Sequence, residues 1–203
     1  MKDEPKIAIL LMAAGSASRM KTIKQLLPWK GSNLLQHTLK TLRKVQKEHL
    51  YVVLGANYEL ILKEIDFVSI PVTTIQNKHW KKGLGNSISC GVAHILDKNE
   101  DYEGILVCLA DQPLLDSTYY RQLIREFKLH HNPIVATKYG KKAGVPAIFR
   151  RNVLPELRLL DSDNGAKNIL DRDKKAIHIF DAGSKIVDID TPDVYQKLYE
   201  QYN

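Results

Sequence analysis

The sequence has few cysteines and no long hydrophobic segment. Only two cysteines, Cys90 and Cys108, occur among 203 residues, and both lie in apolar segments. Two such residues do not form the disulfide framework of a small secreted protein, so we expect a reducing compartment, the cytoplasm. The apolar run that begins at Ile7 is short and leads directly into a Ser/Arg loop. We therefore expect neither a signal peptide nor a segment that crosses a membrane.

Long basic runs are absent as well. The formal net charge of +7 indicates an anionic partner. The basic residues are nevertheless scattered, and they cluster only in short pairs such as Lys81-Lys82, Lys141-Lys142 and Lys174-Lys175. Without a basic stripe or zinc-finger spacing, we expect no nucleic-acid partner.

Residue sets for covalent catalysis are not apparent either. We identify no Ser-His-Asp or Cys-His arrangement, and the seven histidines show no metal-ligand spacing. The adjacent His130 and His131 are expected at a solvated helix end, and both cysteines are expected to be small core residues. The sequence therefore predicts neither a zinc site nor a protein nucleophile.

What is present is an alternation of apolar segments with amphipathic ones. Hydrophobic residues make up 44% of the chain and charged residues 26%, as is ordinary for a globular protein. Short, continuously apolar segments are typical of parallel strands that are covered on both faces. The expected strands are Ile7–Ala13, Leu50–Gly55, Ile70–Gln76, Gly104–Ala110 and Pro133–Tyr139.

Helices are expected between these strands, at 33–45, 57–65, 87–96 and 117–130. In the last of these, Asp116 or Ser117 would be the N-cap. The alternation predicts a doubly wound, mostly parallel α/β sandwich. The face of the first helix that should be buried is formed by Leu34, Leu35, Thr38, Leu39 and Leu42.

After Gly140 the pattern is less regular, but no linker or repeat divides the chain, so one domain of residues 1–203 is expected. A final helix follows Thr191, its expected N-cap, with Pro192 in the first position. The other expected elements are an extended piece at 144–151, short helices at 151–160 and 163–171, and strands at 176–182 and 185–190.

The first expected strand leads into the loop AAGSASRMKTIK at 13–24. In open α/β sheets, ligands bind outside the carboxyl ends of the strands. The small residues Ala13, Ala14 and Gly15 allow a ligand to approach the backbone, whose N–H groups can form an anion-binding nest.

Polar residues of the same loop suit phosphate. Ser16 and Ser18 add hydroxyl donors, and Arg19 and Lys24 add two cations. The loop is neither a Walker loop nor a Rossmann fingerprint. From the residues alone, a solvated surface turn is the alternative.

Two carboxylates follow apolar strands. Asp111 ends the segment ILVCLAD, and Asp190 precedes the last helix. Carboxylates in these places can hold Mg²⁺, although each also has a capping role as an alternative. Asp188 and Asp193 are expected to be solvated or capping residues.

The segment HWKKGLGNSIS places Gly83 and Gly85 before a helix expected to start near Asn86 or Ser87. The free N–H groups of a helix N-terminus suit an anion or the edge of a base. A plain helix cap is the alternative, and Trp80 is expected to be a packing residue.

The order of these motifs resembles the signature of the nucleotidyltransferases with a glycosyltransferase-A-like fold. The nearest branch is the molybdenum cofactor cytidylyltransferase and guanylyltransferase group. The resemblance covers nearly the whole chain and implies a Rossmann-like three-layer sandwich. The segments that carry it are LMAAGSASRM, HWKKGLGNSISCGV, LVCLADQPLL, GVPAIF, DNGAKNIL and VDIDTPDVY.

The resemblance implies an activity and roles for these residues. A nucleoside monophosphate would move from an NTP, with CTP expected and GTP as the alternative, to the terminal phosphate of molybdopterin, and pyrophosphate would leave. Asp111 and Asp190 would bind Mg²⁺, and Arg19 and Lys24 would hold the β- and γ-phosphates. The catalytic residues implied are thus Arg19, Lys24 and Asp111.

The nucleotide would also contact Ser87 and approach closely at Gly83. Residues 1–140 would mainly bind the nucleotide, and residues 141–203 would mainly bind the acceptor and supply the second carboxylate. A molybdoenzyme that receives the product is a further implied partner. We identify no side chain that distinguishes cytosine from guanine.

Two departures from the family pattern leave alternatives open. Lys21 stands where the family usually has Gly, and Val145 stands where it often has His. The change at Val145 allows a sugar or polyol phosphate as acceptor. A nucleotide-binding or cofactor-binding maturation partner without transferase activity is the other alternative.

Overall fold

The computed structural model describes residues 5–20, 22–172 and 176–203. Its centre is a seven-stranded sheet with the order β5-β4-β1-β6-β8-β7-β9. β8 is antiparallel to both of its neighbours, and the other neighbouring pairs are parallel. The strands are β1 (Ile7–Ala13), β4 (Leu50–Leu54), β5 (Thr73–Gln76), β6 (Gly104–Leu109), β7 (Ile134–Tyr139), β8 (Lys142–Arg150) and β9 (Ile177–Phe180).

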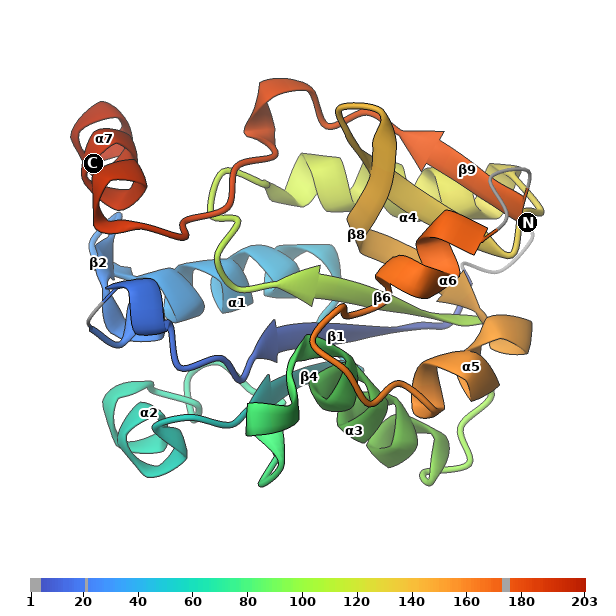
Figure 1. Cartoon of the computed structure of the whole chain (residues 1–203), viewed down its shortest axis with the longest axis horizontal. Coiled ribbons are helices and arrows are strands. Elements are labelled where there is room, and N and C mark those ends of the chain that lie inside the picture. The colour runs from blue at the N-terminus through green and yellow to red at the C-terminus, as the bar shows by residue number, and fades with distance from the viewer. Residues whose placement is uncertain (1–4, 21, 173–175) are drawn as a thin grey trace.

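Helices cover both faces of this sheet, so the expected doubly wound, mostly parallel α/β fold is confirmed (Figure 1). One face packs against α1 (Leu34–Val45), α2 (Tyr58–Glu64) and α4 (Ser117–Leu129). The other face packs against α3 (Leu84–Leu96), α5 (Leu154–Arg158) and α6 (Lys167–Arg172). A small satellite holds the two-stranded β2 (Pro28–Trp29) and β3 (Ser32–Asn33) beside α7 (Pro192–Tyr202).

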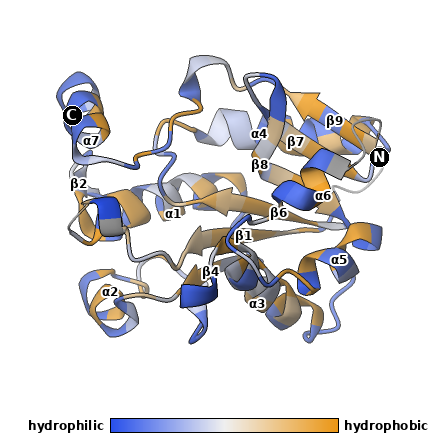
Figure 2. Cartoon of the chain, in the orientation of Figure 1, coloured by the Kyte–Doolittle hydropathy of each residue, from blue (hydrophilic) through white to orange (hydrophobic). Residues whose placement is uncertain are grey.

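β1 lies inside the sheet between β4 and β6, and every residue in it is buried. Successive side chains point to opposite faces, so Ile9 and Leu11 join one apolar cluster while Leu10 and Met12 join the other. The central strands are accordingly hydrophobic along their length, whereas the helices mix both kinds of residue (Figure 2). Cys108 is buried in β6, as expected for a small core residue.

Three helix caps fix where helices begin. The side chain of Asn33 accepts a hydrogen bond of 2.9 Å from the N–H of Gln36. Asp116 is the N-cap of α4 and accepts from Tyr119 at 2.9 Å, which decides between the two expected caps. Thr191 caps α7 as expected. Each cap satisfies an N–H that would otherwise lack a partner in the first turn.

Two expectations about local structure are wrong. Residues 185–190 form no strand; a 3-10 helix (Gly183–Lys185) is followed by extended chain. Ile189 is buried with Trp29 and Leu198 in the satellite cluster, so its apolarity reflects packing outside the sheet. The helix α3 begins at Leu84 rather than near Asn86, because the backbone of Gly83, with φ +105°, ends the preceding turn.

No helix in the described ranges is long and apolar enough to cross a membrane.

Gly91 tests how tightly α3 packs on the sheet. A Cβ atom there would lie 2.6 Å from Leu10 Cδ1 and 2.9 Å from Val53 Cγ2. In an open helix, Gly to Ala stabilises by about 1 kcal/mol. Here we expect Gly91→Ala to lower the free energy of unfolding by about 1–3 kcal/mol, because the core must shift. Urea denaturation measures this, and a gain in stability would contradict the packing.

Candidate active site

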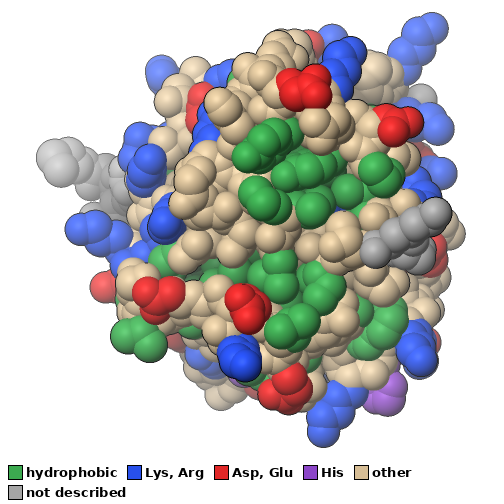
Figure 3. Space-filling model, turned by 90° about the vertical axis from the view of Figure 1, so that its left-hand side faces the viewer, with side chains coloured by type: hydrophobic (Ala, Val, Ile, Leu, Met, Phe, Trp, Pro, Cys, Tyr) green, Lys and Arg blue, Asp and Glu red, His purple; other side chains and the backbone are tan. Residues whose placement is uncertain are grey.

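A cleft of about 440 Å³ opens where β1 and β6 end. Figure 3 views the molecule from the side toward which the arrowheads of these strands point in Figure 1, and apolar side chains gather on this face among scattered charged ones. Most residues expected at the site line the cleft: Ala13, Ala14, Gly15, Ser16, Arg19, Lys24, Gly83, Ser87, Asp111 and Asp190. Ser18 begins a 3-10 helix (Ser18–Met20), and Lys21 lies outside the described residues.

The loop after β1 is held by its carbonyl oxygens. The side chain of Gln25 donates to the carbonyls of Ala13, at 2.8 Å, and Gly15, at 2.9 Å. The N–H of Ala56 donates to the carbonyl of Ala14 at 2.9 Å. Within the described part of the chain, the N–H groups of Gly15 and Ser16 donate to no other residue. These two donors are thus available to an anion in the cleft.

Gln25 is a site residue that the sequence patterns do not reveal. It is 5% exposed and follows Lys24 in a 3-10 helix (Lys24–Leu26). Nothing in its sequence context marks it, because its partners are carbonyl groups that only the folded loop brings near.

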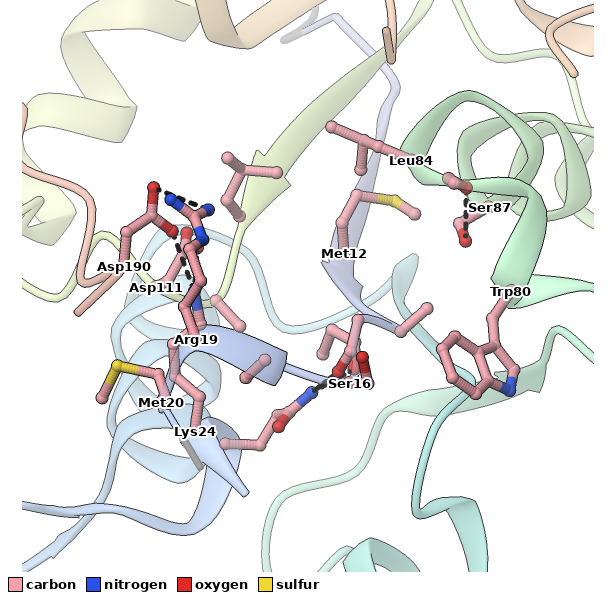
Figure 4. Close-up of a pocket in the computed structure, with 18 of the residues that line it drawn as sticks. Met12, Ser16, Arg19, Met20, Lys24, Trp80, Leu84, Ser87, Asp111 and Asp190 are labelled. Atoms are coloured by element: carbon pink, nitrogen blue, oxygen red, sulfur yellow. Dashed lines mark hydrogen bonds and ion pairs between the residues drawn. The ribbon is translucent and has the colours of Figure 1, made fainter. Parts of the chain in front are cut away.

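A group of four charged side chains lies on one side of the cleft (Figure 4). Lys24 Nζ is 2.6 Å from Asp111 Oδ2 and 3.4 Å from Asp190 Oδ1. Arg19 Nη2 is 3.4 Å from Asp190 Oδ2. The N–H of Ile189 donates to the carbonyl of Asp111 at 2.9 Å, which brings the two carboxylates to the same place from distant segments.

These carboxylates fit a divalent cation. Asp111 Oδ1 is buried and, among the described residues, has no hydrogen-bond partner. A buried carboxylate oxygen without a partner is costly, and oxygen ligands are those that Mg²⁺ and Mn²⁺ prefer. The ammonium of Lys24 contacts both carboxylates and supplies positive charge where a metal ion would also supply it.

Asp188 is not the solvated or capping residue that its sequence context predicts. Gln112 donates a hydrogen bond of 2.8 Å to Asp188 Oδ1. Burial raises the pKa of Asp188, and the neighbouring charges of Asp111 and Asp190 raise it further. Asp188 therefore belongs to the same group of acids, behind the two that line the cleft.

The opposite wall of the cleft is the start of α3 (Figure 4). Ser87 is 2% exposed, accepts a hydrogen bond of 3.0 Å from the Asn77 side chain and donates to the carbonyl of Gly83. Asn77 is a second site residue that the sequence patterns do not reveal, although it follows β5 directly, at the edge where ligands bind.

Packing requires glycine at positions 83 and 85. A Cβ atom at Gly83 would lie 2.4 Å from the Cα of Asp163, and one at Gly85 would lie 2.6 Å from the carbonyl oxygen of Ser162. At both positions, the lack of a side chain leaves room for the loop before α6. Gly83 also lines the cleft, and close approach of a nucleotide to it stays a prediction.

Trp80 and Val145 both pack against the apolar cluster around α3. Trp80 also lines the cleft, so the expected packing role is only part of its position. The carbonyl of Val145 accepts a hydrogen bond of 2.8 Å from the Tyr139 hydroxyl. Val145 is not among the residues that line the cleft.

The family described as "MobA-like NTP transferase domain" matches residues 9–177. The chain belongs to this family. It is 27% identical over 207 residues to the purine catabolism protein PucB of Bacillus subtilis, and the match covers 96% of each chain. These findings confirm the resemblance to a nucleotidyltransferase family.

Two further similarities are informative. The chain is 36% identical over 131 residues to the bifunctional protein GlmU of Mycolicibacterium paratuberculosis, a match that takes in 61% of this chain and 26% of GlmU. The chain therefore spans about a quarter of GlmU. Rv0371c from Mycobacterium tuberculosis H37Rv has a similar crystal structure, with a TM-score of 0.80, 25% identity and coverage of 97% and 98%. Rv0371c has also been crystallised in complex with manganese.

Lys24→Met tests whether the ammonium supplies the positive charge that a metal ion would otherwise bring to the two carboxylates. Without it, the two carboxylates lose the positive charge that lies between them, so we expect Mn²⁺ to bind at least about tenfold more tightly in the absence of nucleotide. Calorimetric titration of Mn²⁺ measures this. Arg19→Met is the control, because Arg19 is 70% exposed and its effect should be smaller. Equal affinity in wild type and Lys24→Met would contradict the arrangement.

Gly15→Ala and Gly83→Ala separate ligand approach from folding. A Cβ atom at Gly15 meets nothing within 4 Å, so Gly15→Ala should leave Tm unchanged and weaken nucleotide binding by about tenfold. Gly83→Ala should lower Tm, because Gly83 has φ +105° and contacts Asp163. Thermal unfolding and nucleotide titration of both variants measure this. A lower Tm for Gly15→Ala would refute the open space beside the loop.

Proposed function

We propose that the protein transfers a nucleoside monophosphate from CTP to the terminal phosphate of molybdopterin, with Mg²⁺ as the metal ion. The observation that carries the proposal is the group formed by Lys24, Asp111, Asp190 and Arg19, set beside a loop with available N–H groups. This arrangement combines cations for phosphates with carboxylates for a metal ion. Membership of the NTP transferase family supports the same chemistry.

The reaction needs no protein nucleophile. An oxygen of the acceptor phosphate attacks the α-phosphorus of the NTP, and the bond from the α-phosphorus to the bridging oxygen of pyrophosphate breaks. Positioning and charge neutralisation supply most of the catalysis in such transfers. When bound at Asp111 and Asp190, the metal ion would neutralise negative charge on the phosphate oxygens.

Each residue has a defined task in this proposal. The N–H groups of Gly15 and Ser16 donate to phosphate oxygens in the cleft. Arg19, whose side chain is 70% exposed, turns toward the β- and γ-phosphates and stabilises the leaving pyrophosphate. Lys24, which lies between the two carboxylates, also binds these phosphates and stabilises the leaving pyrophosphate. Ser87, on the opposite wall, contacts the nucleoside.

The identities of the acceptor and of the nucleotide base are the most specific parts of the proposal. Residues 141–203 supply Asp190 and border the acid group through Asp188, which supports their assignment to the acceptor half. Val145 favours a second candidate, in which the acceptor is a sugar or polyol phosphate, because its side chain packs into the apolar cluster instead of offering a polar group.

Pyrophosphate release tests the proposal directly. CTP, GTP, ATP and UTP are tested in turn with Mg²⁺, each with and without molybdopterin. Release that requires both CTP and molybdopterin is the expected result. Arg19→Ala and Lys24→Ala should each lower kcat by about 10²–10³, the usual cost of losing one charged donor to the transition state.

Other outcomes of this assay separate the alternatives. Release with an alditol phosphate and none with molybdopterin would move the acceptor to the sugar or polyol class. Nucleotide binding without release for any acceptor would favour a maturation partner without transferase activity.

Glu59→Gln is a matched control for Arg19→Ala and Lys24→Ala, because Glu59 lies on α2 and does not line the cleft.

A further inference from the structure

A second group of side chains that can bind metal lies away from the cleft. Glu126 is on the last turns of α4, and His130 is the residue that follows this helix. His178 is on β9, directly opposite Val135 of β7. His130 lies at the end of α4 as expected, but its contact with Glu126 was not apparent from the sequence. The three ligand atoms all lie within 4.8 Å of one another.

The group sits at the opposite edge of the sheet from the cleft. β7 runs in the same direction as β6, because both are antiparallel to β8. His130 precedes β7, so it lies near the amino ends of these strands, whereas the cleft is at the carboxyl ends. In Figure 1 the strand β9 is found at the upper right, whereas the arrowheads of β1 and β6 point to the left.

The spacing of the three ligand atoms is that of a small coordination shell. His178 Nε2 is 2.9 Å and His130 Nε2 is 3.2 Å from the same atom, Glu126 Oε2. Ligands at about 2.0–2.1 Å from a tetrahedral zinc ion are about 3.3 Å apart. The three atoms are therefore close enough to share one ion. Because the lone pair of Nε2 lies in the ring plane and the two rings are stacked, one ring turns when the ion binds.

The two histidine rings lie against each other. The rings of His130 and His178 stack with centroids 3.7 Å apart and an angle of 15° between their planes. A neutral imidazole is the form that binds metal.

The backbone under the group is fixed. Arg150 donates to the carbonyl oxygens of Phe127, His130 and Asn132 at 2.5, 2.6 and 2.9 Å, which holds the end of α4. Its guanidinium also lies 3.9 Å from the centre of the Phe127 ring. The positive charge of Arg150 is thus directed to carbonyl oxygens and a ring face, not to the Nε2 atoms.

Access and ligand chemistry select the kind of ion. The side chains of Glu126, His178 and His130 are 24%, 25% and 42% exposed, so an ion and a water molecule can reach them. Imidazole nitrogen is a preferred ligand of metals such as zinc, copper, iron and nickel, whereas Mg²⁺ prefers oxygen. The two ends of the sheet therefore carry donor sets for different metals.

We propose that Glu126, His130 and His178 bind one metal ion of the kind that imidazole prefers, such as Zn²⁺, with water as the fourth ligand. The ion is bound through Glu126 Oε2 and the Nε2 atoms of both histidines. It connects β9, the edge strand of the sheet, to α4. This site is independent of the nucleotidyltransferase chemistry of the cleft.

Co²⁺ is the probe that distinguishes the two ends of the sheet, because a tetrahedral site with nitrogen ligands absorbs visible light strongly and an oxygen-only octahedral site does so weakly. Titration of the full chain with Co²⁺ should give one strongly absorbing site, and Zn²⁺ should displace it. His178→Ala and Glu126→Gln should weaken Zn²⁺ binding by at least about 100-fold, more than the loss of an outer-shell partner costs.

His131→Ala is the matched control, because His131 is the exposed neighbour of His130 and lies outside the group. It should keep the absorption and the affinity of wild type, and Asp111→Asn should keep them as well. Circular dichroism shows whether each variant is folded, and Zn²⁺ should raise Tm in wild type but not in folded Glu126→Gln. Weak absorption in wild type, or the same Zn²⁺ affinity in His178→Ala and His131→Ala, would overturn the proposal.

Discussion

The ammonium group of Lys24 joins three parts of the chain that are far apart in sequence. It lies between Asp111, which follows β6, and Asp190, which precedes α7, and Lys24 itself belongs to the segment after β1. Two carboxylates that face one cleft repel each other, and positive charge between them offsets this repulsion. The ammonium therefore stabilises the place where the start, middle and end of the chain meet, together with the backbone hydrogen bond from Ile189 to Asp111.

Stability alone does not account for this arrangement. The side chains of Lys24 and Asp111 are only 17% and 19% exposed, and ion pairs withdrawn from water carry a desolvation cost that apolar side chains avoid. Asp111 Oδ1 meanwhile has no partner among the described residues. Asp111 can therefore accept a further ligand, and the neighbouring ammonium of Lys24 can move toward phosphate. Such a pair is suited to exchanging ligands.

Local sequence patterns are enough to predict the first strand, the helix caps and the edge that carries the cleft. Ile7–Ala13 is apolar at every position, which only a strand buried on both faces explains well. Asp116 and Thr191 are capping residue types immediately before helical patterns. Parallel strands present their carboxyl ends at one edge of a sheet, so the strand pattern puts the loop after β1 and Asp111, which follows β6, at the same edge. That β1 and β6 are neighbours follows only from the structure.

Features that depend on distant partners follow from tertiary packing instead. Ile189 belongs to an apolar pattern that predicts a strand, yet its burial is provided by the satellite cluster around α7. Gln25 and Asn77 acquire their roles from groups that the folded chain brings to them. His130 and His178 are distant in sequence, and only the docking of β9 beside α4 stacks their rings. Patterns of neighbouring residues report local backbone preference and burial, whereas contacts across the chain follow from how the layers pack.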